Sequence, residues 1–195
     1  AFVVTSKPIE QNHLTLAFPG LDYNSPKRFA LQLLSSILGG GVSSRLFQQV
    51  RERQGLCYTI YSYGADHADT GLLGVYTALS PELEGEALDA ACALLRELAE
   101  HGPTQEELER AREQSKANVV MGLESTQSRM SHAGRSLLFS GEILTPEQII
   151  AAYDSVTHED VVALAQEIFR WDQVSLSAVG QVRTAEAYRA LVLEA

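Results

Sequence analysis

The chain is poor in positive charge and contains no long apolar run. Its 15 Lys and Arg residues are outnumbered by 25 Asp and Glu residues, which gives a formal net charge of −10 at pH 7. An acidic chain repels phosphate backbones, so we expect no nucleic-acid partner. A basic peptide is a more natural partner, and the alternative is that the charge only keeps the chain soluble. No run of about 18 apolar residues is present, so no membrane-spanning helix is expected.

Cysteine is also scarce. The two cysteines, Cys57 and Cys92, fall in a predicted strand and a predicted helix, and they form neither a metal-binding pair nor a disulfide framework. We interpret both as reduced core residues, which favours a cytoplasmic or other reducing compartment. The sequence starts at Ala1 without Met or a signal peptide, so we expect a processed product or a cut piece of a longer chain.

The usual catalytic and metal-binding motifs are missing. The five histidines form neither H-E-x-x-H nor H-x-x-E-H, and no G-x-S-x-G nucleophile motif occurs. Asp66, His67 and Asp69 cluster in a short segment, but polar residues are expected in a hairpin turn. We therefore expect no metal site, and we find no complete catalytic machinery in this chain alone.

Hydrophobic periodicity and turn signals predict a mixture of strands and helices. Ser25 and Pro26 are interpreted as the N-cap and first residue of the first helix. Thr104 with Glu107, Thr145 with Gln148, and Thr157 with Asp160 fit helix starts. The predicted strands are 13–18, 57–64, 71–79 and 174–179; the predicted helices are 26–38, 44–54, 81–102, 104–124, 125–139, one starting at 145, 157–171 and one after 184.

This order favours an α+β fold rather than a doubly wound parallel sheet, because strands and helices do not alternate regularly. We expect one mainly antiparallel sheet with helices packed on one face. The polar link 65–70 predicts an antiparallel hairpin between the second and third strands. No linker, low-complexity tract or internal repeat divides the chain, so we expect a single domain over residues 1–195.

Gly39, Gly40 and Gly41 precede a predicted helix that carries Arg51 and stops before Tyr58. The glycines are compatible with a plain turn, a phosphate cradle or a loop that receives an extended peptide. The phosphate interpretation lacks a following Gly-Lys-Ser/Thr or a G-x-G-x-x-G between strand and helix. Considered separately, Arg51 is interpreted as a solvated charge on an exposed helix face, and Tyr58 is interpreted as an ordinary aromatic residue of a strand. Together, at one helix-to-strand joint, they could bind a peptide carbonyl or an oxyanion.

The segments 38–47 and 50–58 closely resemble the C-terminal half of the inverted-motif zinc peptidases, a superfamily that includes the mitochondrial processing peptidase, pitrilysin and insulin-degrading enzyme. Segment 104–116 resembles a Thr-x-x-Glu-Leu helix of that family. Segment 123–130 resembles its helix-joining segment, and segment 157–169 resembles the helix before its last strand. The resemblance covers nearly the whole chain.

The resemblance implies a clamshell of two homologous α+β halves. In active members the N-terminal half holds zinc, and the C-terminal half supplies an Arg and a Tyr that match Arg51 and Tyr58 here. It implies that zinc is carried by a partner domain and that no cofactor is held in this chain. The implied partners are that N-terminal zinc-bearing domain or subunit and a peptide substrate.

We therefore expect the C-terminal half of a zinc metalloendopeptidase, with Arg51 and Tyr58 as catalytic residues and Gly39, Gly40 and Gly41 as substrate-binding residues. The isolated chain is not expected to be active. The alternative is a noncatalytic subunit or scaffold that pairs with a separate zinc-bearing subunit, and a third interpretation is a phosphate-binding domain. A fragment without its other half is also a candidate homodimer, because the surface that would face the other half of the clamshell would be exposed.

Overall fold

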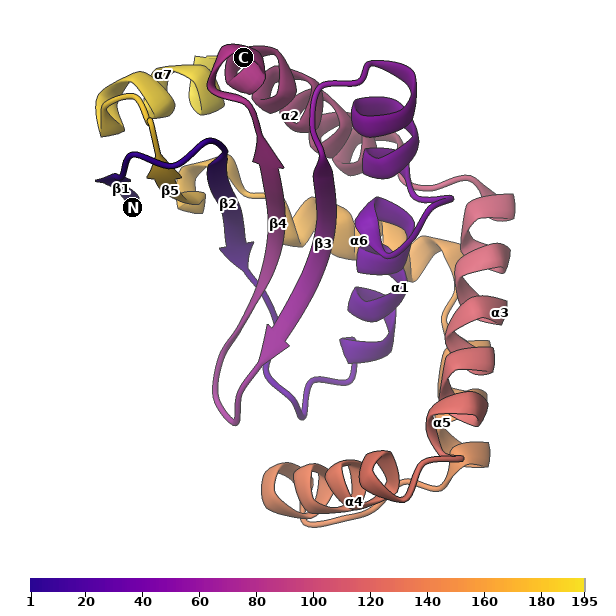
Figure 1. Cartoon of the computed structure of the whole chain (residues 1–195). Coiled ribbons are helices and arrows are strands. Elements are labelled where there is room, and N and C mark those ends of the chain that lie inside the picture. Colours follow the sequence, from indigo (N-terminus) through magenta and orange to yellow (C-terminus); the bar gives the residue numbers. More distant parts are fainter. Residues whose placement is uncertain (195) are drawn as a thin grey trace.

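The computed structural model describes residues 1–194 and contains a five-stranded sheet in the order β1-β5-β2-β4-β3 (Figure 1). The strands are β1 (Phe2–Ser6), β2 (Asn12–Pro19), β3 (Thr59–Asp66), β4 (Gly71–Leu79) and β5 (Ser175–Gly180). β2 pairs antiparallel with β4 and β5, β3 pairs antiparallel with β4, and β1 pairs parallel with β5. The predicted α+β class with a mainly antiparallel sheet is therefore confirmed.

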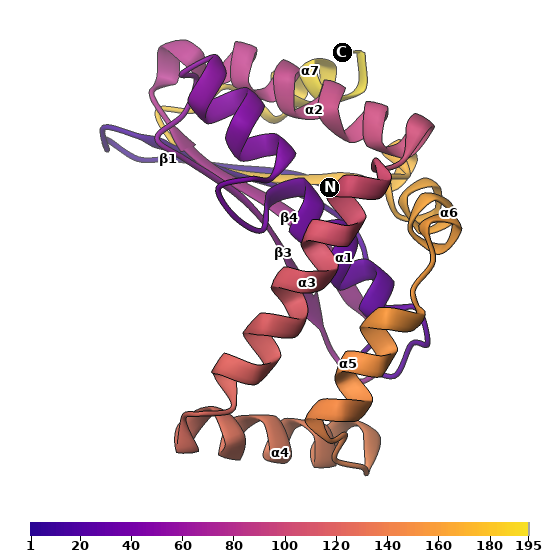
Figure 2. The ribbon, with the colours of Figure 1, turned by 90° about the vertical axis from the view of Figure 1, so that its right-hand side faces the viewer.

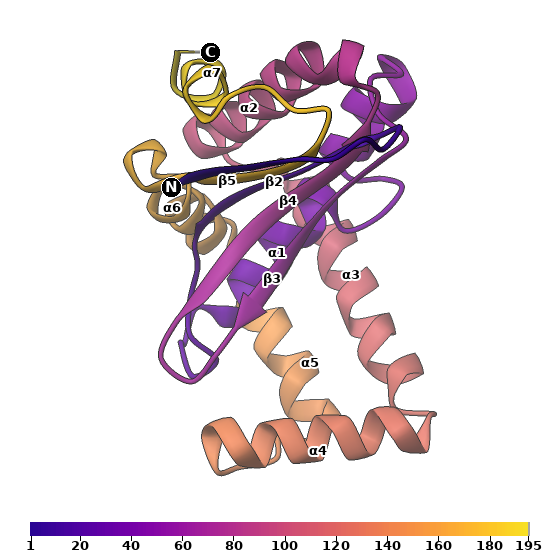
Figure 3. The ribbon, with the colours of Figure 1, turned by 60° about the vertical axis from the view of Figure 1, so that its left-hand side comes forward.

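The seven α-helices of the described chain differ in their distance from the sheet. α6 passes behind β3 and β4 in Figure 1, while α4 lies away from the sheet, across the far ends of α3 and α5 (Figures 2 and 3). The helices are α1 (Arg28–Gly39), α2 (Glu84–His101), α3 (Gln105–Gly122), α4 (Thr126–Ser140), α5 (Pro146–Ser155), α6 (His158–Ile168) and α7 (Ala185–Glu194).

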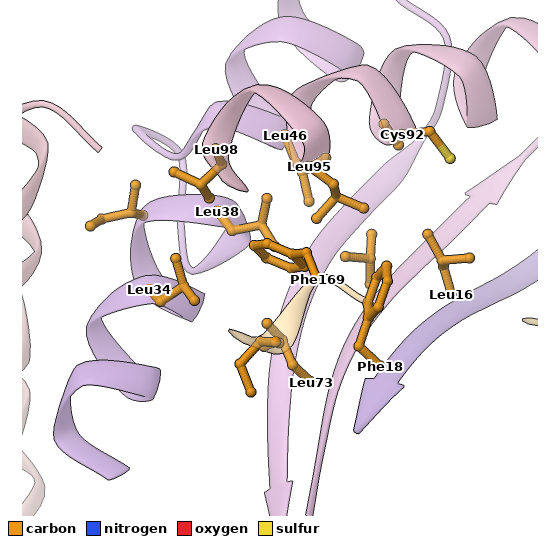
Figure 4. Packing of buried hydrophobic residues seen from close by; sticks show 14 of the residues in the cluster. Leu16, Phe18, Leu34, Leu38, Leu46, Leu73, Cys92, Leu95, Leu98 and Phe169 are labelled. Carbon is orange, nitrogen blue, oxygen red and sulfur yellow. The ribbon is translucent and has the colours of Figure 1, made fainter. Parts of the chain in front are cut away.

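Alternation along the strands gives the sheet two different faces. Leu14, Leu16 and Phe18 of β2 are buried, whereas the residues between them are only partly covered. The buried face packs against leucines of α1 and α2 and against Phe169 after α6 (Figure 4). Helices thus bury one face of the sheet, as predicted, because each strand places alternate side chains on opposite faces.

Several helix starts follow the predicted capping chemistry. Thr104, Thr145 and Thr157 each accept a hydrogen bond from the backbone N–H three residues on, and Glu107, Gln148 and Asp160 complete the three capping boxes. These boxes satisfy N–H groups that have no partner inside the helix. The antiparallel β3–β4 hairpin is also as predicted.

Two sequence predictions are wrong in detail, and one strand was missed. Ser25 and Pro26 do not cap α1, because they form a turn closed by Arg28 N–H to Ser25 O at 3.1 Å, and the helix starts at Arg28. The sequence analysis missed the strand β1, because the strand that it pairs with in the described chain, β5, lies at the other end of the sequence. The helix expected to end near residue 171 stops at Ile168, and Trp171–Gln173 forms a separate 3₁₀ turn.

None of the helices in the described part of the chain is long and apolar enough to cross a membrane.

Candidate functional site

Arg51 and Tyr58 flank the joint between a short helix and the sheet. Arg51 lies in Phe47–Arg53, which is wound as a π-helix rather than the expected α-helix. Gly55 then turns the chain with a φ of 65°, a conformation that favours glycine. The Tyr58 N–H donates to Ala78 O on β4 at 3.0 Å, which fixes the backbone of Tyr58 against the sheet. π-helical turns are rare and occur frequently at functional sites.

The structure brings the two predicted side chains together. The Arg51 guanidinium carbon lies 6.0 Å from the centre of the Tyr58 ring and 4.7 Å from the centre of the Phe47 ring. Tyr58 is 70% exposed, and the Arg51 side chain is 39% exposed, with Glu52 3.9 Å away. A cation that lies near two aromatic rings has a restricted direction, while its N–H groups remain available to a ligand.

A hollow of about 250 Å³ adjoins this pair. We call it the Arg51 hollow, and its lining residues are Gly39, Gly40, Gly41, Val42, Phe47, Arg51, Ile60 and Tyr61. The predicted glycines and Arg51 therefore share one surface, whereas Tyr58 stands beside the hollow and does not line it.

The three glycines differ in their surroundings. Gly39 is the last residue of α1, and a Cβ there would lie 2.3 Å from the backbone N of Ser62, so glycine allows α1 to approach β3. A Cβ on Gly40 would lie 2.6 Å from Ser36 Cα, whereas one on Gly41 would meet nothing within 4 Å. The glycines thus end one helix instead of opening the next, and Gly41 is open to solvent.

Arg45 is a residue of this region that sequence reasoning did not single out. Its Nε and Nη2 atoms donate to the two carboxylate oxygens of Glu107 at 2.7 and 2.8 Å, and Nη2 also donates to Gly102 O at 3.2 Å. Glu107 is the residue that completes the Thr104 capping box, and it accepts from Thr104 N–H at 2.7 Å. Arg45 therefore ties the segment that leads into the Arg51 helix to the start of α3.

This ion pair shifts the protonation equilibria of both partners. Burial would raise the pKa of Glu107, but hydrogen bonds from Arg45 and Thr104 outweigh burial, and the pKa is lowered from 4.5. The hydrogen bond to Glu107 raises the pKa of Arg45. The Arg45 and Glu107 side chains are only 13% and 21% exposed, so solvent screens the pair weakly. The only sequence signal was the adjacency of Arg45 to the glycine segment.

Within residues 1–194, no group of three or more His, Cys, Asp or Glu side chains is placed to hold a metal ion. Asp66, in the segment of His67 and Asp69, instead forms an ion pair with Arg135 of α4. These residues do not fit a zinc site. Cys57 and Cys92 are free and buried, and burial raises the pKa of Cys92 to about 11, so both are unreactive core thiols.

This arrangement is an α+β fold with a cation and a phenol at its surface and, within residues 1–194, no group of side chains placed to hold a metal ion. Residues 1–115 match the family model described as the peptidase M16 inactive domain. The chain belongs to this family, which confirms the resemblance seen in the sequence.

Several curated proteins that are similar in sequence to this chain are named as zinc proteases. An uncharacterized zinc protease of Streptomyces coelicolor is 41% identical over 92% of this chain, and one of Bacillus subtilis is 38% identical over 85%. The matches cover 39% and 41% of those proteins. The chain thus spans about two fifths of the length of these curated relatives.

Solved structures share the fold. A peptidase M16 inactive domain from Pseudomonas fluorescens superposes with a TM-score of 0.83 at 25% identity, covering 93% of this chain and 43% of the other. A protease from Helicobacter pylori gives a TM-score of 0.79 at 21% identity, covering 91% of this chain and 43% of the other. The second likeness supports the fold alone.

Proposed function

We propose that this chain is the C-terminal half of a zinc metalloendopeptidase and that Arg51 and Tyr58 serve a zinc site carried by a partner N-terminal domain. The observation that carries the proposal is the pairing of the Arg51 guanidinium and the Tyr58 ring, 6.0 Å apart, beside a glycine-lined hollow. Membership of a family described as an inactive domain fits a half without metal ligands of its own.

In this proposal the Tyr58 hydroxyl donates a hydrogen bond to the oxyanion that forms at the scissile carbonyl. The exposed position of Tyr58 leaves its side chain accessible to a substrate held against a facing domain. Donors aimed at developing negative charge are among the largest contributors to catalysis. The zinc chemistry belongs to the partner half, since residues 1–194 contain no group of His, Cys, Asp or Glu side chains placed to hold a metal ion.

Arg51 binds a peptide carbonyl of the substrate next to the scissile bond, or supports Tyr58 by holding positive charge near its ring. Its guanidinium has five N–H donors in a planar fork that matches carbonyl and carboxylate oxygens. The Phe47 and Tyr58 rings both lie close to it, at 4.7 and 6.0 Å, so substrate binding costs less side-chain entropy than it would for a free surface arginine.

Gly39, Gly40 and Gly41 are assigned to substrate binding in the same proposal. Gly40 and Gly41 are exposed and lack a side chain that would keep a peptide backbone out of the Arg51 hollow. Gly39 is buried against Ser62 and contributes by holding this loop close to β3. The partner is a zinc-bearing N-terminal half, in the same polypeptide or in a separate subunit.

The test is peptide cleavage by the complete two-half protein with single substitutions in this chain. Tyr58→Phe is expected to lower kcat by about 10²–10³-fold with little change in KM, because one oxyanion donor is lost. Arg51→Ala is expected to lower kcat/KM. Arg53→Ala is the matched control, because Arg53 is an exposed cation of the same helix that lies outside the Arg51 hollow.

Wild-type rates in both variants would exclude Arg51 and Tyr58 from the mechanism. A zinc-loaded two-half protein that cleaves no peptide would favour the noncatalytic subunit or scaffold instead. The mass of the isolated chain measured by light scattering distinguishes a monomer from a homodimer in which two copies cover the surface that would face the other half.

A further inference from the structure

Helix α4 carries an apolar surface that nothing in the described chain covers. Six of the eleven large hydrophobic side chains that the described chain leaves exposed lie within residues 120–143, a segment that contains this helix. Met130, Gly134, Leu137 and Leu138 are all exposed. Their spacing of four, three and one residues places them on one face of a helix. We call this surface the α4 stripe.

Another face of α4 is held by the rest of the chain. The Phe139 ring stacks on Tyr23 with the ring centres 5.1 Å apart, and the Phe139 carbonyl oxygen accepts a hydrogen bond from Asn24 Nδ2 at 2.9 Å. Arg135 forms an ion pair with Asp66 at the end of β3. These contacts fix the orientation of α4, which lies away from the sheet (Figures 2 and 3), and they leave the α4 stripe in solvent.

Gly134 of the α4 stripe has no explanation within the chain itself. Glycine is unfavourable in the interior of a helix, because it has the most backbone freedom to lose. A Cβ at Gly134 would meet nothing within 4 Å, so no contact inside the described chain requires the missing side chain. A glycine on an outward helix face allows another segment to approach the helix closely. This glycine therefore indicates a partner that packs directly against the α4 stripe.

The chemistry of the α4 stripe favours an apolar partner surface. None of its four residues is charged, and both arginines of α4, Arg129 and Arg135, are bonded to oxygen atoms of this chain. The only two methionines of the chain, Met121 and Met130, are both exposed in this segment. Methionine is flexible and polarizable, and it is frequent on surfaces that adapt to another protein. A charged partner surface would lose hydration here without meeting an opposite charge.

The region that matches this chain is 39% of one curated relative and 41% of another, so these relatives are more than twice as long as that region. A protein of that length has another half that the structure does not contain. Building on the function proposed above, we infer that the α4 stripe is a docking surface for that zinc-bearing half, which meets it with an uncharged apolar surface.

The docking surface is separate from the candidate site. Ile60, near the start of β3, lines the Arg51 hollow, whereas Asp66, at the end of β3, binds α4 through Arg135. Six residues of an extended strand span about 20 Å. Docking at the α4 stripe therefore joins the two halves at about one strand length from the hollow and leaves the hollow free for a peptide.

Oxidation of Met130 by hydrogen peroxide measures whether the α4 stripe is covered in the complete two-half protein. The peroxide transfers one oxygen atom to the thioether sulfur, which gives a sulfoxide and water, and the rate follows the exposure of the sulfur. We expect Met130 to be oxidised about ten-fold more slowly in the folded two-half protein than in the same protein unfolded in urea. Mass spectrometry of the peptide that contains Met130 gives both rates.

Gly134→Leu distinguishes a covered stripe from a free one by the sign of its effect. On a free helix face leucine is more favourable than glycine, so the thermal unfolding midpoint would rise. Under a docked partner the added side chain clashes, so we expect the midpoint of the two-half protein to fall and Met130 to be oxidised faster. Ser128→Leu is the matched control, because Ser128 is exposed on α4 outside the stripe, and it should leave the Met130 rate unchanged.

A photo-cross-linking amino acid in place of Leu138, which is 85% exposed in this chain, identifies the partner. A cross-link to the zinc-bearing half is the expected result, and a cross-link to a second copy of this chain would assign the stripe to a homodimer instead. Oxidation of Met130 at the rate of the unfolded protein, or a midpoint for Gly134→Leu above that of wild type, would overturn the docking surface.

None of these measurements involves cleavage, so they separate the docking surface from the proposed function. The docking surface stands even where Arg51→Ala and Tyr58→Phe leave kcat/KM unchanged. Its failure leaves the proposed function standing as long as those two variants slow cleavage.

Discussion

Substitution of Arg45 by Ala tests how the Arg51 helix is held in place. The change removes two charge-assisted hydrogen bonds, at 2.7 and 2.8 Å, from a carboxylate whose side chain is 21% exposed. Hydrogen bonds to charged groups contribute about 1.5–3 kcal/mol net. Glu107 keeps its bond from Thr104 N–H, so it is not left wholly unpaired. We expect Arg45→Ala to lower the free energy of unfolding by about 2–3 kcal/mol.

The matched control is Arg110→Ala on α3, the helix that also carries Glu107. Arg110 pairs with Glu106 at 2.9 Å, but these side chains are 46% and 85% exposed. An exposed pair four residues apart on a helix contributes only about 0.3–0.5 kcal/mol. Urea unfolding at pH 7 measures both variants. A loss for Arg45→Ala as small as that for Arg110→Ala would refute the view that this ion pair anchors the segment.

The pH dependence supplies a second check on the same pair. The pKa of Glu107 is lowered in the folded chain from 4.5, so the unfolded chain binds more protons than the folded chain between the two pKa values. The stabilisation is complete above about pH 4.5 and is lost as the pH falls through the folded-state pKa. Arg45→Ala should therefore differ most from wild type near neutral pH, and the difference should shrink in acid.

Other predictions concern backbone contacts and a buried polar cluster. Gly39→Ala places a Cβ 2.3 Å from Ser62 N and should destabilise the fold by about 1–3 kcal/mol, whereas Gly41→Ala, with open space around it, should stay within about 0.5 kcal/mol in thermal unfolding. Tyr188→Phe removes a 2.7 Å hydrogen bond to the buried Glu84 carboxylate and should cost about 1–3 kcal/mol; an unchanged unfolding midpoint would mean that Glu84 finds another donor.

The sequence predicted most of the architecture because the signals that carry it are local. Alternation in β2 and β5 and the three threonine capping boxes are read from neighbouring residues, and all appear in the structure. β1 gave no such signal, since a short strand is recognised chiefly by its partner and β5 lies more than 160 residues away. Long-range pairing is therefore the part of the fold that periodicity could not supply.

The residues of the candidate site were chosen from the sequence, and their arrangement comes from the structure. Spacing and resemblance pointed to Arg51 and Tyr58, and the structure places them 6.0 Å apart. The bond from Arg45 to Glu107 joins residues 62 positions apart, so no local pattern could indicate it. Which side chains share a face of the sheet depends on the register of all five strands.

The most direct test of the central proposal is a crystal structure of the complete two-half protein with zinc and a peptide transition-state analogue. The proposal predicts that the metal is held entirely by the partner half. It also predicts a Tyr58 hydroxyl about 2.7–3.1 Å from the oxyanion oxygen of the analogue, with Arg51 on an adjacent peptide carbonyl. An analogue bound far from both side chains, or a zinc ion held by residues of this chain, would contradict it.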